Sequence, residues 1–195
     1  VEILAEKVTF TGCQVRNWGK DLNQLDAGIF VAREAEGAVV SNNRLQGPAF
    51  GVWLDATPNV TVSNNHIRGD VSLRSQDRGN GIHLFNTTGA LIEGNDISET
   101  RDAIYIETAN RNTIRGNVMS DLRYGIHYMY SMHNLLENNV TRGTRTGYAL
   151  MQSKYLKVFN NRSENDENYG ILMNFITNSE LRNNVVTGVS QGQSA

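Results

Sequence analysis

Residues 125–134, with the sequence GIHYMYSMHN, place two histidines, two methionines and two tyrosines within ten positions. Thioether sulfur and imidazole nitrogen are soft or borderline neutral ligands that suit Cu(I), and they suit Mg²⁺ or Ca²⁺ poorly. Methionine is also a common filler of core gaps, and a histidine on a strand often only satisfies a hydrogen bond. The residue types alone favour packing, so a metal site here depends on how the fold places these side chains.

An internal repeat of about 22 residues organises the chain. Its first marker is an asparagine, which recurs at intervals of one repeat, with one longer interval, at Asn43, Asn65, Asn95, Asn117, Asn139, Asn161 and Asn184. Its second marker is a small residue 14 or 15 positions earlier, at Gly28, Gly51, Gly81, Ala103, Gly125, Gly147 and Gly170. The chain is therefore an array of similar units.

Each unit contains two short strand-like segments. Apolar residues follow the small-residue marker at one and three positions, as in Ile104 and Ile106, and another lies three positions before each asparagine, as in Ile114. A spacing of two marks one face of a strand, and no unit has the run of about 10 residues that a helical repeat needs. The sequence predicts an all-β, right-handed parallel β-helix of about eight coils, forming a single domain over residues 1–195, in which equal positions stack about 4.8 Å apart.

The asparagine column is expected at a sharp corner, because asparagine tolerates left-handed backbone and stacked amides hydrogen-bond along the ladder. Cys13, the only cysteine, falls in the same column and is expected to be structural. Two intervals carry extra residues, at 17–27 and 70–80, both just before the small-residue marker. Insertions on one side of a solenoid often frame a binding face, so we expect them to overhang the strand that follows.

The outward positions of that strand are rich in aromatic residues, histidine and methionine. One column holds Phe30, Trp53, His83, Tyr105, His127, Ala149 and Leu172, and the next holds Ala32, Asp55, Phe85, Glu107, Met129, Met151 and Asn174. An exposed patch of this kind is usually a contact surface. We therefore predict a partner or ligand surface at Phe30, Trp53, Phe85 and Tyr105.

The same columns give the donor set of a soft-metal site. His127 and Met129 share a face by alternation, and Met151 follows Met129 by one full repeat, which stacks it one coil away. These three residues are the predicted nucleus. Further candidates to complete or relay the site are His83, two coils away, and Met132 and His133, near the turn that follows.

Composition restricts the partners. The net charge is −2, and lysine and arginine are spread singly along the chain, so no basic stripe is predicted and nucleic acid is not an expected partner. No apolar run approaches the roughly 20 residues of a membrane span. The first residues already read as strand sequence, so we expect the chain to be part of a longer protein.

Several stretches are similar to the NosD family, over most of residues 28–190. They are GIHLFNTTGALIEGN (81–95), RDAIYIETANRNTIRGN (101–117), DLRYGIHYMYSMHN (121–134), GYALMQS (147–153) and YGILMNFITNS (169–179). The resemblance implies a periplasmic, non-enzymatic protein that works with an inner-membrane ABC transporter and supplies copper to nitrous-oxide reductase. The thioether and imidazole ligand types add the expectation that the copper is Cu(I) and is bound transiently. Ala103 and Ala109 depart from the family pattern, which has glycine and serine there, and neither is a candidate ligand.

Two other functions stay open from the residues alone. A polysaccharide hydrolase would need two carboxylates across the scissile bond, and Asp55 and Glu107 share a column with Phe85 between them. A lyase or epimerase could use His83, Tyr105 or His127 as a base, but no arginine or lysine shares their column. A passive carbohydrate-binding module would use the aromatic rings as stacking platforms.

Overall fold

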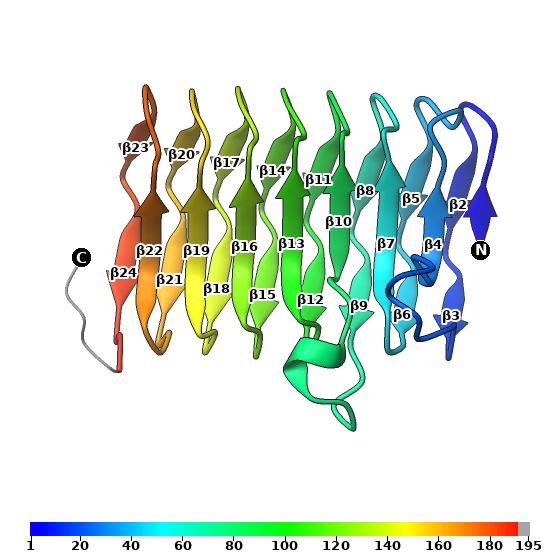
Figure 1. The fold of residues 1–195 in the computed structure, drawn as a ribbon, viewed down its shortest axis with the longest axis horizontal. Helices are drawn as coiled ribbons and strands as arrows, with labels where there is room; N and C mark the ends of the chain where they lie inside the picture. Colours follow the sequence, from blue (N-terminus) through cyan, green and yellow to red (C-terminus); the bar gives the residue numbers. More distant parts are fainter. Residues whose placement is uncertain (191–195) are drawn as a thin grey trace.

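The computed structural model describes residues 1–190, which form one solenoid of three parallel β-sheets with eight strands each (Figure 1). The first sheet comprises β1 (Glu2–Ile3), β4 (Ala27–Val31), β7 (Phe50–Asp55), β10 (Ile82–Phe85), β13 (Asp102–Glu107), β16 (Tyr124–Met129), β19 (Thr146–Met151) and β22 (Tyr169–Asn174). The second comprises β2 (Thr9–Thr11), β5 (Val39–Ser41), β8 (Thr61–Ser63), β11 (Leu91–Glu93), β14 (Thr113–Arg115), β17 (Leu135–Glu137), β20 (Lys157–Phe159) and β23 (Glu180–Arg182). The predicted all-β parallel helix is confirmed.

A third sheet, which the repeat pattern did not predict, follows the asparagines. It comprises β3 (Gln14–Arg16), β6 (Arg44–Gln46), β9 (His66–Arg68), β12 (Asp96–Ser98), β15 (Val118–Ser120), β18 (Val140–Arg142), β21 (Arg162–Glu164) and β24 (Val185–Thr187). The prediction of two strands per coil was wrong, because each of these strands is very short and only its middle residue points inward. Such short strands leave too few positions for an alternating pattern to stand out.

The asparagine ladder is present, but its backbone geometry differs from the prediction. The left-handed residue is the one before each ladder asparagine, such as Asn42, Asn64 and Asn138 with φ of 56°, 54° and 57°. The corner is made by that neighbour, which leaves the ladder asparagine free to point its amide along the stack.

The ladder amides are fully hydrogen-bonded. Asn117, for example, donates its backbone N–H and its side-chain Nδ2 to Oδ1 of Asn139, at 3.1 and 2.9 Å, and Nδ2 also donates to the carbonyl of Ile92 at 3.0 Å. Cys13 starts the column through its backbone N–H, which donates to Oδ1 of Asn43 at 2.9 Å. Cys13 is half-buried rather than enclosed.

The inward columns fill the core with aliphatic side chains and with the fully buried Tyr128 and Tyr148. The glycine marker lies where successive coils of the first sheet approach closely: a Cβ added at Gly51 would lie 2.5 Å from the carbonyl oxygen of Gly81. Ala103 occupies the same column, fully buried in β13. The alanine at this position is thus accommodated inside the strand.

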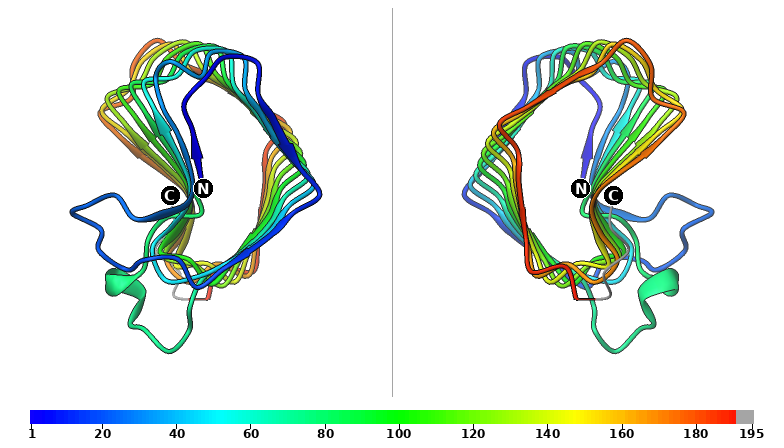
Figure 2. Two further views of the ribbon diagram at one scale, coloured as in Figure 1. Left: turned by 90° about the vertical axis from the view of Figure 1, so that its right-hand side faces the viewer. Right: turned by 90° about the vertical axis from the view of Figure 1, so that its left-hand side faces the viewer.

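Seen along its axis, the solenoid is indented on the side of the first sheet, and two loops project beside the indentation (Figure 2). The first loop joins β3 to β4, and the second, with the 3₁₀ helix η1 (Ser75–Asp77), joins β9 to β10. As predicted, both insertions lie at the start of first-sheet strands, although Ala27 itself already belongs to β4. Residues 1–190 contain no helix with the length and hydropathy of a membrane span.

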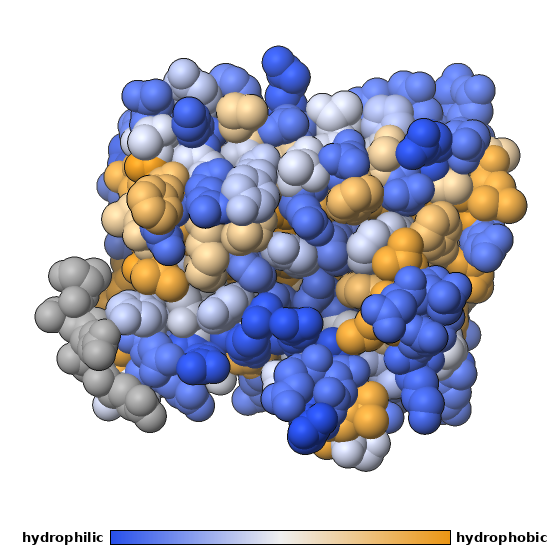
Figure 3. All heavy atoms as spheres, viewed as in Figure 1, coloured by the Kyte–Doolittle hydropathy of each residue, from blue (hydrophilic) through white to orange (hydrophobic). Residues whose placement is uncertain are grey.

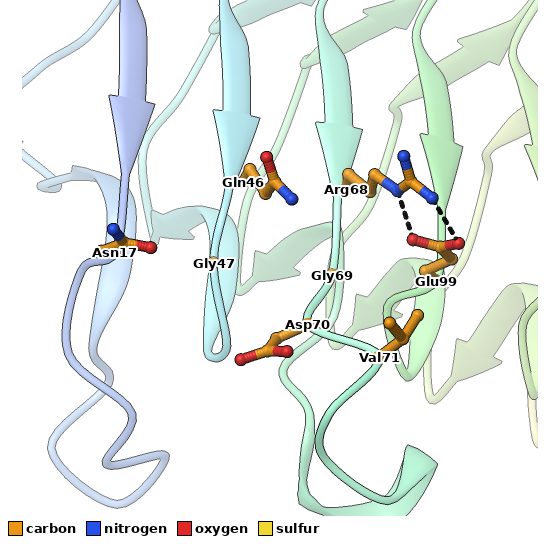
Figure 4. Close-up of a pocket in the computed structure, with 8 residues that line it drawn as sticks. All are labelled: Asn17, Gln46, Gly47, Arg68, Gly69, Asp70, Val71 and Glu99. Atoms are coloured by element: carbon orange, nitrogen blue, oxygen red, sulfur yellow. Dashed lines mark hydrogen bonds and ion pairs between the residues drawn. The ribbon is translucent and has the colours of Figure 1, made fainter.

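A pocket of about 360 Å³ lies between the two loops (Figure 4). Asn17 contributes from the first loop, and Asp70 and Val71 from the second. Arg68 and Glu99 lie at its side and form a bidentate ion pair between neighbouring coils, with 2.7 Å between Nη2 and Oε1. Because these two charges satisfy each other, the pocket offers a ligand amide and backbone groups together with the carboxylate of Asp70, whose Oδ1 already accepts from Ser72.

Candidate metal centre

A column of stacked rings runs across the outward face of the first sheet. His83 on β10, Tyr105 on β13 and His127 on β16 are direct register partners, and their ring centroids are 4.7 Å and 4.5 Å apart. Trp53 on β7 continues the stack, 4.0 Å from His83. The predicted columns therefore exist, and their residues follow one another in the predicted order.

The prediction that this column is an exposed aromatic patch was partly wrong. Trp53 and His83 are only 6% and 4% exposed, while Phe30, Phe85 and Tyr105 are half-buried. Stacking hides the ring faces, and the ring of Phe50 packs on Trp53 at 4.7 Å. The patch therefore presents ring edges more than ring faces to a partner.

His127 is held by a buried carboxylate. Its Nδ1 lies 2.9 Å from Oδ2 of Asp102, a residue only 1% exposed, and Arg123 donates to the same carboxylate from Nε and Nη2 at 2.8 and 2.6 Å. Burial opposes ionisation of Asp102, but the hydrogen bonds from Arg123 and His127 outweigh it and keep the pKa of the carboxyl below its ordinary value. A charged carboxylate accepts only, so Nδ1 of His127 carries the proton and donates.

This arrangement leaves Nε2 of His127 as the free nitrogen of the ring. Nε2 has no hydrogen-bond partner among residues 1–190, and the His127 side chain is 13% exposed. A histidine whose other nitrogen donates to a carboxylate is the usual form of a metal-binding imidazole, because the carboxylate fixes the tautomer and the ring orientation. His127 is thus prepared to act as a ligand through Nε2.

Met129 and Met151 are direct register partners on β16 and β19. Both are partly exposed, and they alternate with the fully buried Tyr128 and Leu150, so they lie on the same outward side as His127. Adjacent strands are about 4.8 Å apart, which places two thioethers and one imidazole on neighbouring positions of one face. The structure therefore brings together the three residues of the predicted nucleus.

His83 stands apart from that nucleus. The ring of Tyr105 lies between it and His127, and both its nitrogens are engaged: the amide Nδ2 of Asn80 donates to Nδ1 at 3.2 Å, and Nε2 donates to Oε2 of Glu107 at 3.3 Å. Burial lowers the pKa of His83, and the hydrogen bond from His83 lowers the pKa of Glu107. His83 is a packed, hydrogen-bonded residue of the ring stack in this structure.

Met132 and His133 lie on the turn between β16 and β17, not on the sheet face. Met132 is 40% exposed, and the ring of His133 stacks on Tyr155 of the next coil at 4.8 Å and 3°. They are available at the surface near the end of β16, but the structure shows no contact that ties them to His127.

Asp102 and Arg123 were not predicted from the sequence as parts of the site. Asp102 lies just before the small-residue marker, in register with Tyr124, which is three positions before His127. The signal was present as a separation of 25 residues, one repeat plus three, between Asp102 and His127. Within residues 1–190 no group of three or more histidine, cysteine, aspartate or glutamate side chains is arranged to hold a metal.

A family model described as "Periplasmic copper-binding protein (NosD)" matches residues 63–194. The chain belongs to the NosD family. Two curated NosD relatives, each called "Probable ABC transporter binding protein NosD", come from Pseudomonas aeruginosa and Stutzerimonas stutzeri. The first is 63% identical over 95% of this chain and the second 55% identical over 97%, and the chain spans 43% and 44% of their lengths.

Solved structures with the same architecture are more distant from this NosD chain. The Dettilon tailspike protein matches 79% of the chain and 33% of its own with a TM-score of 0.65 at 21% identity. A glycoside hydrolase matches 82% of the chain and 38% of its own with a TM-score of 0.58 at 12% identity. At these identities the likeness establishes the β-helix fold and nothing about activity.

Proposed function

We propose that this NosD chain is the copper-holding part of an accessory protein that delivers copper, as Cu(I), for assembly of the metal centres of nitrous-oxide reductase. The proposal places the protein in the periplasm, in association with an inner-membrane ABC transporter, and gives it no catalytic step. Family membership supports copper and the periplasm, because the family is described by both words. The names of the two relatives support the transporter.

The observation that carries the proposal is the state of His127. Its Nδ1 is tied to the buried Asp102 while Nε2 stays free, next to the register pair Met129 and Met151. Two thioethers and one neutral imidazole favour Cu(I) over hard divalent ions, and none of the three has to lose a proton to bind. A set without thiolate can release its copper again, as delivery requires.

The ligand assignment is tested by anaerobic Cu(I) loading, with X-ray absorption used to count sulfur and nitrogen neighbours. Replacing Met129 and Met151 together by leucine removes both sulfurs at nearly constant volume, a change that usually costs less than about 1.5 kcal/mol of stability. We expect the sulfur neighbours to disappear and the affinity to fall. The matched control is Met119→Leu, at a fully buried methionine of β15. Unchanged stoichiometry and affinity in the double variant would refute the assignment.

The delivery role is tested with the full-length protein in cells that lack their own copy. The double leucine variant should leave nitrous-oxide reductase poor in copper, whereas the Met119→Leu protein should restore its copper content. Restoration by both proteins would show that these methionines do not serve delivery.

One observation favours a second function, a polysaccharide lyase or epimerase. His127 paired with Asp102 could act as a base, and Arg123 supplies a cation beside a column that contains none of its own. However, Arg123 is already neutralised by Asp102, and burial together with Glu107 raises the pKa of Tyr105 to about 12, which keeps its phenol neutral. Cleavage or epimerisation of alginate or pectate by the purified protein, abolished in His127→Gln, would establish this alternative.

A carbohydrate-binding module is less well supported, because Trp53 is only 6% exposed and its ring is packed against Phe50 and His83. A hydrolase is also less well supported, since the carboxylate of Glu107 is bonded to His83 and Phe85 separates it from Asp55.

A further inference from the structure

Three arginines that are scattered in the sequence lie side by side in the fold. Arg101, Arg123 and Arg145 each immediately precede a first-sheet strand, β13, β16 and β19. The backbone N–H of Arg123 donates to the carbonyl of Arg101 at 2.9 Å, and that of Arg145 donates to the carbonyl of Leu122 at 2.9 Å. The sequence predicted no basic stripe, because its lysines and arginines are spread singly along the chain. Stacking of the coils brings these three arginines, each one repeat apart, into a short basic stripe.

These three arginines line one pocket beside the second insertion loop. The pocket has a volume of about 520 Å³, within the usual range of small-ligand sites. Its lining comprises Ser75, Gln76, Arg78, Arg101, Asp121, Leu122, Arg123, Gly143, Arg145 and Glu167, so four guanidinium groups face two carboxylates. In Figure 3 strongly hydrophilic side chains gather below β13 and β16, beside this loop.

Arg78 builds the wall of the pocket. Its Nε and Nη2 donate to the carbonyl of Leu73 in the loop at 3.0 and 2.7 Å, and its Nη1 donates to the carbonyl of Glu99 at 3.0 Å. These bonds tie the loop to the neighbouring coil. Arg78 therefore holds the pocket in shape and has few N–H groups left for a ligand.

The other three arginines keep donors that no described residue takes. The Nε of Arg101 is buried and has no hydrogen-bond partner among residues 1–190, and the exposed guanidinium of Arg145 makes no ion pair within them. Arg123 uses Nε and Nη2 on Asp102, which leaves its Nη1. A buried N–H without an acceptor is costly, and adjacent like charges repel. Asp102 is the ion-pair partner of Arg123 alone, and within residues 1–190 neither Arg101 nor Arg145 forms an ion pair, so an anion beside these two would be stabilised.

We propose that this pocket binds an oxyanion, a carboxylate or a phosphate group, between Arg101, Arg123 and Arg145. The planar guanidinium fork matches both groups and can bind two of their oxygens at once. Ser75 and Gln76 add a hydroxyl and an amide at the same pocket. The pocket contains none of the proposed copper ligands, although Arg123 contacts Asp102, the residue that holds His127. The test of the pocket does not depend on copper.

Isothermal titration calorimetry of the purified protein with inorganic phosphate, and separately with citrate, tests the site. Saturable binding of phosphate alone assigns a phosphate ligand, binding of citrate alone assigns a carboxylate, and binding of both assigns a general oxyanion site. No saturable binding of either anion overturns the proposal.

Variants locate the binding. Arg101→Gln with Arg145→Gln should weaken binding by at least about tenfold, and Arg145→Gln alone, at an exposed side chain, should weaken it without disturbing the fold. The charge-matched control is Arg33→Gln with Arg111→Gln, two exposed arginines outside the pocket. Equal weakening by both pairs would mean that net charge alone attracts the anion, and would overturn the pocket.

Discussion

An asparagine at position 102 would keep the shape of the buried side chain but remove its charge. Asp102 accepts three hydrogen bonds, two from Arg123 and one from His127, and is almost completely enclosed. In Asp102→Asn the amide nitrogen would face a donor, and the guanidinium of Arg123, whose side chain is 25% exposed, would lose its counter-ion. The variant should therefore be less stable, and the ring of His127 should no longer be held in one orientation.

The size of each effect follows from the contacts. Removing one member of a buried ion pair costs about 3–5 kcal/mol, and the partial exposure of Arg123 places the loss at the lower end, about 3 kcal/mol. Loss of the group that orients a metal-binding histidine typically weakens metal affinity by about 10–100-fold. The pKa of Asp102 is lowered in the folded protein, so its contribution to the free energy of unfolding depends on pH in a known direction. The contribution is fully present above the ordinary carboxyl pKa of about 4, and it is lost as the pH falls through the lowered value.

Urea unfolding at several pH values measures the stability loss, and anaerobic competition with a chromophoric Cu(I) chelator measures the affinity. Asp166→Asn is the matched control: Asp166 is fully buried and accepts from Thr141 Oγ1 and the backbone N–H of Thr144, at 2.9 and 2.8 Å, but contacts no histidine. It should lose stability and keep its copper affinity. Native copper affinity in folded Asp102→Asn would refute the role given to His127.

Two further predictions concern the ladder and the ring stack. Asn117→Ala removes the hydrogen-bond partner of the Asn95 backbone N–H and of the Ile92 carbonyl, and should lower the free energy of unfolding in urea by about 3 kcal/mol. Asn184→Ala lies at the half-exposed end of the ladder, where water can replace the amide, and should lower it by about 1 kcal/mol. Equal losses in the two variants would contradict a cooperative ladder. Burial lowers the pKa of His83, so below about pH 6.5 the unfolded protein takes up a proton that the folded protein resists. The free energy of unfolding should therefore fall as the pH drops below this value, by up to about 1.4 kcal/mol per pH unit. A His83→Gln protein with the same slope would refute this prediction.

Positions that repeat with the coil were predictable from sequence. The regular period of the repeat placed Met129 beside Met151, and it placed His127 two coils from His83 with Tyr105 between them. Parallel stacking makes this possible, because a fixed period turns a difference in residue number into a position in space. The asparagine ladder was predictable for the same reason.

Contacts between different columns were not predictable in this way. The bond between Asp102 and His127 joins two columns that lie three positions apart, on successive coils, and it depends on side-chain length and rotamer as well as on register. Burial of Trp53 depends likewise on how Phe50 and His83 pack around it. The arginine column was not predicted because its members are 22 residues apart in the sequence and become neighbours only when the coils stack.

The proposed metal ligands lie on coils whose repeat is uninterrupted. Both insertions precede earlier strands, β4 and β10. The outward face of β7 and β10 is filled by packed rings such as Trp53 and His83. From Asn95 to Asn161 the ladder asparagines follow one another at a constant interval. Ligand geometry tolerates errors of only about 0.5 Å, so a shared site needs neighbouring coils of equal path length. Side chains from β13, β16 and β19 can therefore meet on this uniform stretch of the solenoid. The insertion loops lie beside it and limit access to the proposed site from one side only.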